Sequence, residues 1–187
     1  MPKKEDIQNI TIGGFCGTVS SSGQTLKNNI ENLKIKIGNQ SNLTIGGLYG
    51  TITGNNNTIS ESEVKNVEIY SDDAINAENF IAGGICGNNK GKTKIQYSYV
   101  DEFKINCKEN KGYKIGGILG TIERNAGEMT TQTLISNCFA QNIDIKMENT
   151  EISGLGGILG YGNNATKDNY IQYCWVHGKV RSNRGNI

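Results

Sequence analysis

The chain has 187 residues and a net charge of +1, from 19 basic and 18 acidic side chains. This balance excludes a surface field of one sign, so we expect neither nucleic acid nor an anionic membrane surface as a partner. No apolar run approaches the roughly 20 residues of a membrane-spanning helix, so we expect no membrane insertion, and the Lys-rich start does not resemble a signal peptide.

A glycine motif recurs five times and sets the organisation of the chain. Each copy has two adjacent glycines, an apolar residue, a variable residue and a third glycine, at intervals of 33 to 40 residues, which indicates a repeat protein. The adjacent glycines are Gly13 and Gly14, Gly46 and Gly47, Gly83 and Gly84, Gly116 and Gly117, and Gly156 and Gly157. No helix signal follows any copy. The glycines are therefore predicted to permit close backbone approach at a strand bend, and not to cradle phosphate.

A second pattern follows each glycine motif and predicts strands with one buried face. Its copies begin at Thr25, Ile59, Ile95, Ile135 and Ile171. Three positions on comes a small residue, five on an aliphatic residue, and eight and ten on a further apolar pair, which the last copy replaces by Lys179 and Arg181. We expect about three short strands per repeat, separated by corners rich in Asn and Gly.

Single repeats of this kind cannot bury a face, whereas stacked repeats can. We predict an all-β, right-handed parallel β-helix of about five coils, in which each strand pairs with its equivalent one coil on. One inward column would contain Phe15, Leu48, Ile85, Ile118 and Ile158. An outward column of Lys34, Glu68, Lys104 and Asp144 alternates in sign, which would disfavour a slip of one coil, with chance as the alternative explanation.

Residues 1–187 are expected to form a single repeat domain. The repeats begin at once and stop without an obvious cap, so we also expect the domain to be a piece of a larger protein.

The five motifs resemble the GLUG repeats (glycine–glycine–leucine–x–glycine) of large bacterial surface proteins, and similar repeats in the N-terminal part of IgA1-specific metalloendopeptidases. The resemblance extends from Gly13 to about Lys179 and includes segments such as Ile135-Ser136-Asn137-Cys138. The fourth motif position departs from the usual Val and holds Cys16, Tyr49, Cys86, Leu119 and Leu159. The resemblance implies an extracellular, cell-wall-associated bacterial setting and carries no catalytic groups.

The five cysteines are an odd number, which argues against a complete disulfide framework. Cys16 and Cys86 are predicted to lie two coils apart in one column, beyond the reach of a disulfide. Cys138 and Cys174 are only one coil apart and could in principle reach each other. Cys107 has no cysteine equivalent in the other copies. We expect all five thiols to be free and to fill inward positions, because free cysteine is a preferred interior residue.

No constellation of side chains predicts catalysis or metal binding. His177 is the one histidine and is expected on the surface of the last coil, which leaves no His-rich metal site and no Ser-His-Asp triad. The acidic residues Glu61, Glu63, Asp72, Asp73, Asp101 and Glu102 do not recur on adjacent coils, as a glycosidase or a calcium-dependent lyase would need. We expect no metal, no cofactor and no enzymatic activity.

Five aromatic residues form the candidate binding site: Tyr97, Tyr99, Phe139, Tyr173 and Trp175. Strand parity predicts that their rings point outward from three consecutive coils. An exposed patch of this size is typical of a docking surface, for a glycan by ring stacking or for a partner protein. The alternative is that a neighbouring segment covers the rings, such as the long connection from Thr121 to Leu134.

Two functions from different classes stay open. The first is a non-catalytic repeat module of a surface-exposed bacterial protein, which serves adhesion, ligand binding or spacing. Its partners would be a host glycan or protein, or neighbouring domains of the same chain. The second is a small carbohydrate-active β-helix enzyme, a polysaccharide lyase or hydrolase, because fold alone does not decide function. A cytosolic or phage-associated structural protein is a third option, which free cysteines and a missing signal would suit.

Overall fold

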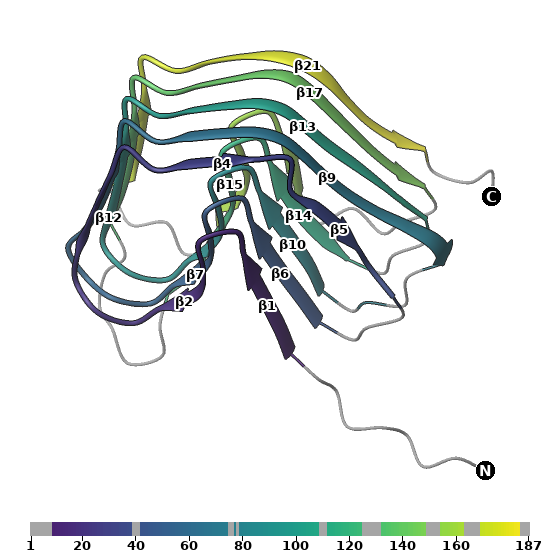
Figure 1. Cartoon of the computed structure of the whole chain (residues 1–187), viewed down its shortest axis with the longest axis horizontal. Coiled ribbons are helices and arrows are strands. Elements are labelled where there is room, and N and C mark those ends of the chain that lie inside the picture. The colour runs from purple at the N-terminus through teal and green to yellow at the C-terminus, as the bar shows by residue number, and fades with distance from the viewer. Residues whose placement is uncertain are drawn as a thin grey trace.

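The structure is a computed structural model that describes residues 9–38, 42–74, 77, 79–108, 112–124, 132–148, 154–162 and 169–183. Every strand pairing among these residues is parallel, and the strands stack in four sheets. The chain therefore winds as a parallel β-helix, which confirms the predicted fold class (Figure 1). The described ranges contain no helix that is long and apolar enough to cross a membrane.

The repeats stack in four sheets, which we name A to D, with one strand per repeat in each sheet except that the first repeat gives two short strands to sheet D. Sheet A contains β1 (Asn9–Gly13), β6 (Asn42–Gly46), β10 (Asn79–Gly83), β14 (Tyr113–Gly116) and β18 (Gly154–Gly156). Sheet B contains β2 (Cys16–Val19), β7 (Tyr49–Ile52), β11 (Cys86–Asn89), β15 (Leu119–Ile122) and β19 (Leu159–Gly162). Sheet C contains β3 (Gln24–Leu26), β8 (Asn57–Ser60), β12 (Thr93–Gln96), β16 (Thr133–Ser136) and β20 (Tyr170–Gln172). Sheet D contains β4 (Asn29–Glu31), β5 (Lys34–Lys36), β9 (Glu63–Ala74), β13 (Tyr99–Lys108), β17 (Phe139–Glu148) and β21 (Trp175–Asn183).

The glycine motif is the corner between sheets A and B, so its two flanks are separate strands. The prediction of three strands per repeat is wrong for this reason. A Cβ atom on the first glycine of each motif would lie under 3.0 Å from the carbonyl oxygen of the residue three positions on. On the second glycine of the first four motifs, it would lie equally close to the backbone of the next coil. Only glycine fits both positions, which confirms the predicted close backbone approach.

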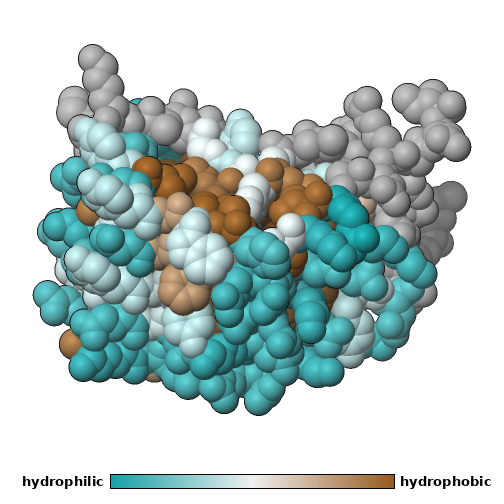
Figure 2. All heavy atoms as spheres, turned by 90° about the horizontal axis from the view of Figure 1, so that it is seen from above, coloured by the Kyte–Doolittle hydropathy of each residue, from teal (hydrophilic) through white to brown (hydrophobic). Residues whose placement is uncertain are grey.

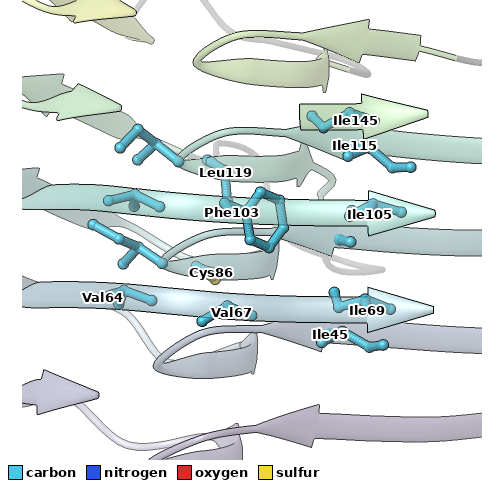
Figure 3. Packing of buried hydrophobic residues seen from close by; sticks show 14 of the residues in the cluster. Ile45, Val64, Val67, Ile69, Cys86, Phe103, Ile105, Ile115, Leu119 and Ile145 are labelled. Carbon is cyan, nitrogen blue, oxygen red and sulfur yellow. The ribbon is translucent and has the colours of Figure 1, made fainter. Parts of the chain in front are cut away.

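Inward side chains of successive coils lie in register and form one continuous core. In sheet D, Ile105 pairs with Ile69 on one side and with Ile145 on the other, and all three are buried (Figure 3). Phe103 lies opposite Val67, and both of these side chains are buried as well. The columns that the repeats predict are therefore the physical core of the molecule.

The predicted column at the third motif position is confirmed in the inner coils and wrong at its start. Leu48, Ile85 and Ile118 are fully buried, and Ile158 is partly buried. Phe15 is 60% exposed, because it belongs to the first coil and no described coil covers it from the other side. Its ring instead meets the Tyr49 ring edge-on, with 5.8 Å between the centroids.

The last coil is one residue shorter than the repeat pattern predicts, at the corner within sheet D between the partners of Ala140 and Ile143. Gly178 lies opposite Ile143, and Val180 lies opposite Ile145, so the apolar position that we assigned to Arg181 belongs to Val180. The earlier coils turn this corner with one extra residue, whose φ lies between 49° and 58°: Asn32, Asn66, Glu102 and Asn142. Because the last coil lacks an equivalent of this residue, Gly178 takes the first position of the apolar pair and Val180 the second. The prediction that the last coil loses this pair is therefore wrong for the second position only.

The alternating charges lie in one column, as predicted, and this column extends into the last coil. Cα partners run from Lys34 to Glu68, Lys104, Asp144 and Lys179. Only Lys34 and Glu68 form a direct ion pair along it, at 3.1 Å. Lys104 pairs with Glu102 of its own strand, and Asp144 accepts from Arg181 at 2.8 Å. Each exposed pair contributes only tenths of a kcal/mol, so the column favours the correct register more than it adds stability.

Candidate functional site

Three of the five predicted aromatic residues form a stack along the axis of the β-helix. Tyr99, Phe139 and Trp175 occupy equivalent positions at the starts of β13, β17 and β21. The ring centroids are 4.8 Å apart for Tyr99 and Phe139 and 5.0 Å apart for Phe139 and Trp175, with interplanar angles of 11° and 3°. The rings stack because the spacing of parallel strands nearly equals the spacing of stacked rings.

Because the rings stack on one another, a ligand can reach only some of their faces. Phe139 has a neighbouring ring on both faces, and Tyr99 has Phe139 on one face and the ammonium of Lys65 near the other, 5.3 Å from the ring centroid. A hydrogen bond to Glu63 raises the pKa of Lys65, so this group stays a cation. Trp175 is 51% exposed, and one of its faces has no ring neighbour among the described residues. Of the three stacked rings, Trp175 is therefore the one available for stacking on a ligand.

The other two rings lie at the corner between sheets C and D. Tyr97 and Tyr173 have φ values of 50° and 53°, and their side chains are 60% and 79% exposed. Asn137 occupies the equivalent position in the coil between them, with a φ of 52°. Left-handed backbone at a tyrosine is uncommon and marks a tight corner that directs the ring to solvent. Tyr97, Tyr99, Phe139, Tyr173 and Trp175 together are called the aromatic corner below.

The small residue after each corner position explains why the chain turns there. Ser98 donates its hydroxyl to the carbonyl of Gln96 at 2.9 Å, and Cys138 donates its thiol to the carbonyl of Ser136 at 3.2 Å. The same contact, from one residue to the carbonyl two positions back, recurs at Asn28, Ser62 and Cys174. Most of these carbonyls also accept a backbone N–H from the preceding coil, as Gln96 does from Glu61 and Ser136 from Tyr97. The small residue therefore adds a second, local hydrogen bond that fixes the turn.

Sequence reasoning missed a groove on the outer face of sheet C, beside the aromatic corner. The groove encloses about 520 Å³, and its lining includes Lys94, Leu134, Tyr170 and Gln172. Tyr170 is exposed and lies in register with Leu134. Because Gln172 precedes Tyr173 in the chain, the groove adjoins the corner in the last coil. The signal was available, since Tyr170 and Gln172 flank the inward Ile171 and must point outward by strand parity.

The segment that could cover the rings of the aromatic corner, according to the sequence, runs from Thr121 to Leu134. Its central residues, 125–131, lie outside the described residues. At its described end, Leu134 lines the groove.

The acidic residues singled out in the sequence have polar or cationic partners. Glu61 pairs with Lys27 at 3.7 Å, Asp72 with Lys36 at 2.5 Å, and Glu63 with Lys65. Asp101 accepts from the side-chain amides of Gln141 at 3.0 Å and Asn142 at 2.8 Å. Asp73 has no described side chain, and His177 is exposed in β21. Within the described ranges, no three His, Cys, Asp or Glu side chains are grouped so that they could hold a metal ion.

All five cysteines are free, as predicted. Cys86, Cys107 and Cys138 are buried, and Cys16 and Cys174, in the two terminal coils, are partly buried. Burial raises the pKa of each of the three buried thiols to about 12. These side chains are therefore uncharged fillers of the core at neutral pH.

Comparison with known proteins finds no matching family model, no similar curated protein and no similar solved structure. Arguments about function therefore start from the aromatic corner, the groove beside it and the fold that positions them.

Proposed function

We propose that this chain is a non-catalytic, ligand-binding repeat module of a surface-exposed bacterial protein. The observation that carries the proposal is the exposure of Tyr97, Tyr173 and Trp175 on a rigid stack of coils. Monomeric proteins rarely leave a large apolar patch exposed to solvent unless the patch has a binding role. The bacterial surface setting comes from the GLUG resemblance of the glycine motifs, and the partner would be host material or a neighbouring domain.

A glycan suits this surface better than a protein that would dock through a flat apolar interface. The open rings are separate platforms, because Asn137 lies between Tyr97 and Tyr173 in the stack of corners. The groove next to them supplies the side-chain amide of Gln172 and the ammonium of Lys94. A sugar ring offers an apolar face to an aromatic ring and hydroxyl groups to such polar neighbours, which matches this mixture.

The experiment is a binding screen of the purified chain against an array of bacterial and host glycans, followed by affinity measurements on the best ligand. We expect Tyr173→Ala and Trp175→Ala each to weaken binding about fivefold, since one stacked ring contributes about 1 kcal/mol. Phe15→Ala is the matched control, because Phe15 is an exposed aromatic residue in the first coil, far from this surface. Unchanged affinity in the Tyr173→Ala/Trp175→Ala double variant, with native circular dichroism, would refute the proposal.

The carbohydrate-active enzyme is the alternative, and one feature bears on it. Glu31, Asp101 and Glu102 line a shallow hollow of about 260 Å³ on sheet D, together with Lys65. A glycosidase needs one carboxylic acid and one carboxylate facing a bond in the substrate. In this hollow Asp101 and Glu102 are bound by other side chains, so a binding role is the better supported of the two. Release of reducing ends from the bound glycan would favour the enzyme.

A further inference from the structure

A second groove lies on the other side of the molecule, between the outer faces of sheets A and B. It encloses about 550 Å³. The chain turns sharply at the glycine corner (Figure 1). Residues from the outer faces of both sheets line one hollow as a result. Its lining in the first coils is short and polar, with Asn9, Asn42 and Asn79 on sheet A and Thr18 and Thr51 on sheet B.

The asparagines of this groove form an ordered row. The side-chain amide of Asn42 donates to Asn9 at 2.9 Å, and that of Asn79 donates to Asn42 at 3.4 Å. These bonds fix the orientation of the amide groups along the groove. A rigid row of donors and acceptors is suited to a ligand with many hydroxyl groups.

A charged cluster follows this row in the third and fourth coils. The Glu123 carboxylate accepts from Lys114 at 2.7 Å and from the amide of Asn88 at 2.8 Å, and Lys90 lies 3.7 Å away. Burial alone would raise the pKa of Glu123, but the hydrogen bonds from Lys114 and Asn88 outweigh it and lower the pKa. Glu123 is therefore a carboxylate at neutral pH, an acceptor and not an acid catalyst.

An aromatic ring borders the same cluster. The ammonium of Lys114 lies 5.2 Å from the centroid of the Tyr161 ring, and Tyr161 pairs with Thr121 across the strands β15 and β19. Tyr161 is partly exposed. The cluster thus combines a ring, a carboxylate, an amide and two ammonium groups.

Two buried oxygen atoms at this place lack a hydrogen-bond partner among the described residues: Asn88 Oδ1 and Thr121 Oγ1. Asn88 is 3% exposed and Thr121 is fully buried, and the two residues are Cα partners. The Asn88 amide cannot be turned to repair this, because its nitrogen must donate to the Glu123 carboxylate. Buried polar atoms are nearly always paired, so two neighbouring exceptions beside a groove mark a place for a further hydroxyl group, from a ligand or from ordered water.

We propose that the groove between sheets A and B is a saccharide-binding site centred on Glu123. Ligand hydroxyls donate to Asn88 Oδ1 and to the Glu123 carboxylate and accept from Lys90 and Lys114, while one sugar ring lies against Tyr161. A phosphate or a sulfate fits less well, because Glu123 lies between the two lysines and repels an anion. This site is separate from the aromatic corner, and it goes beyond the function proposed above.

The test is a titration of the isotope-labelled chain with neutral oligosaccharides of glucose, galactose, mannose and N-acetylglucosamine. We expect at least one of them to shift the side-chain amide resonance of Asn88, which reports on the site itself. Glu123→Gln and Tyr161→Ala are each expected to weaken this binding at least tenfold. Glu68→Gln is the control for removal of a charge, since Glu68 lies in the outward column of sheet D.

Separate variants distinguish this site from the aromatic corner. Trp175→Ala is expected to leave the Asn88 titration unchanged, whereas Glu123→Gln is expected to leave binding at the corner unchanged. If Glu123→Gln does not fold, Tyr161→Ala and Lys90→Gln replace it, because both side chains are more exposed than that of Glu123. The proposal is overturned if no saccharide shifts the Asn88 amide. It is equally overturned if ordered water alone occupies Asn88 Oδ1 in crystals grown with the saccharide.

Discussion

At the scale of single residues, the thiols show how this core tolerates polar atoms. Cys138 donates to the carbonyl of Ser136 at 3.2 Å, and Cys86 to that of Asn88 at 3.4 Å. Each thiol thus fills space in a column and supplies a weak hydrogen bond to a carbonyl at a turn or strand end. Cys107, which has no cysteine equivalent, packs in the position that Met147 takes in the next coil.

The position of each thiol predicts its reactivity. A buried thiol whose pKa is about 12 is almost entirely protonated at pH 8 and is also inaccessible. We expect Cys86, Cys107 and Cys138 to react with Ellman's reagent only as fast as the chain unfolds, while Cys16 and Cys174 react within minutes. Five thiols should titrate after denaturation. Rapid reaction of more than two thiols in the folded protein would contradict this assignment.

The same shifts predict a loss of stability in alkali. In the unfolded chain each thiol ionises near the ordinary thiol pKa of 9.0, whereas burial raises the pKa of the three folded thiols to about 12. Unfolding therefore releases protons between these pH values, and the free energy of unfolding falls as the pH rises. Urea midpoints at pH 8 and pH 10.5 measure the effect, and Cys138→Ala, which cannot ionise, should show a smaller drop between them.

At the scale of elements, the corner between sheets A and B depends on glycine. A Cβ atom at Gly84 would meet the backbone of Gly117 in the next coil and the side chain of Val100 in its own. Neither neighbour can move without shifting a whole coil. The packing of coils against each other is therefore set by the second glycine of the motif.

We expect Gly84→Ala to destabilise the fold by about 3 kcal/mol, at the upper end of the cost of overpacking in a core. Urea denaturation followed by circular dichroism measures this loss. Gly23→Ala is the matched control, because a Cβ atom there would have only an ordinary contact at 4.0 Å, with the Asn57 side chain. Equal stability of the two variants would show that the coils are not packed as described.

The repeats predicted the stacking of elements well and the angles between them poorly. Recurring apolar positions imply which residues lie in register, so the columns of Leu48 and Val64 and the charge column follow from the sequence alone. The extra strand arises from a bend within the glycine motif, and the shortened last coil from a single missing residue before Gly178. The recurring glycine motif does predict the bend, but it does not reveal that the two flanks enter different sheets, and a single missing residue leaves no periodic signal.

The sequence likewise predicts some features of the candidate sites and not others. Strand parity placed the rings of the aromatic corner outward, but it does not reveal that Phe139 has both faces covered by neighbouring rings. The groove at Glu123 depends on the angle between sheets A and B, which no local pattern encodes. The outward direction of the rings could therefore be predicted from the sequence, and the groove between sheets A and B could not.

At the scale of the whole molecule, the described coils end in open faces. Ile171, Val176 and Val180 belong to inward columns, yet each is at least 40% exposed, because no described coil follows the last one. Figure 2 views the molecule from the side of this coil and shows hydrophobic residues gathered in the middle of the face. Unpaired parallel strands around such a face favour association with another chain.

We expect the isolated chain to self-associate at high concentration, and Ile171→Lys to abolish this, because a charge in the middle of the apolar face opposes its burial. Sedimentation velocity at increasing protein concentration measures the change. His177→Lys is the control, since His177 is exposed in the same coil but outside the inward columns. Association that persists in the Ile171→Lys variant would place the contact elsewhere.

The sign pattern of the outward column limits what such association can build. With members at Lys34, Glu68, Lys104, Asp144 and Lys179, the column starts and finishes on the same sign. Two copies joined first coil to last would bring ammonium against ammonium, so endless polymerisation carries a penalty at every junction. Inverting one end with Lys179→Glu removes that penalty, and electron microscopy at low salt should then show fibres where the natural chain forms only small species.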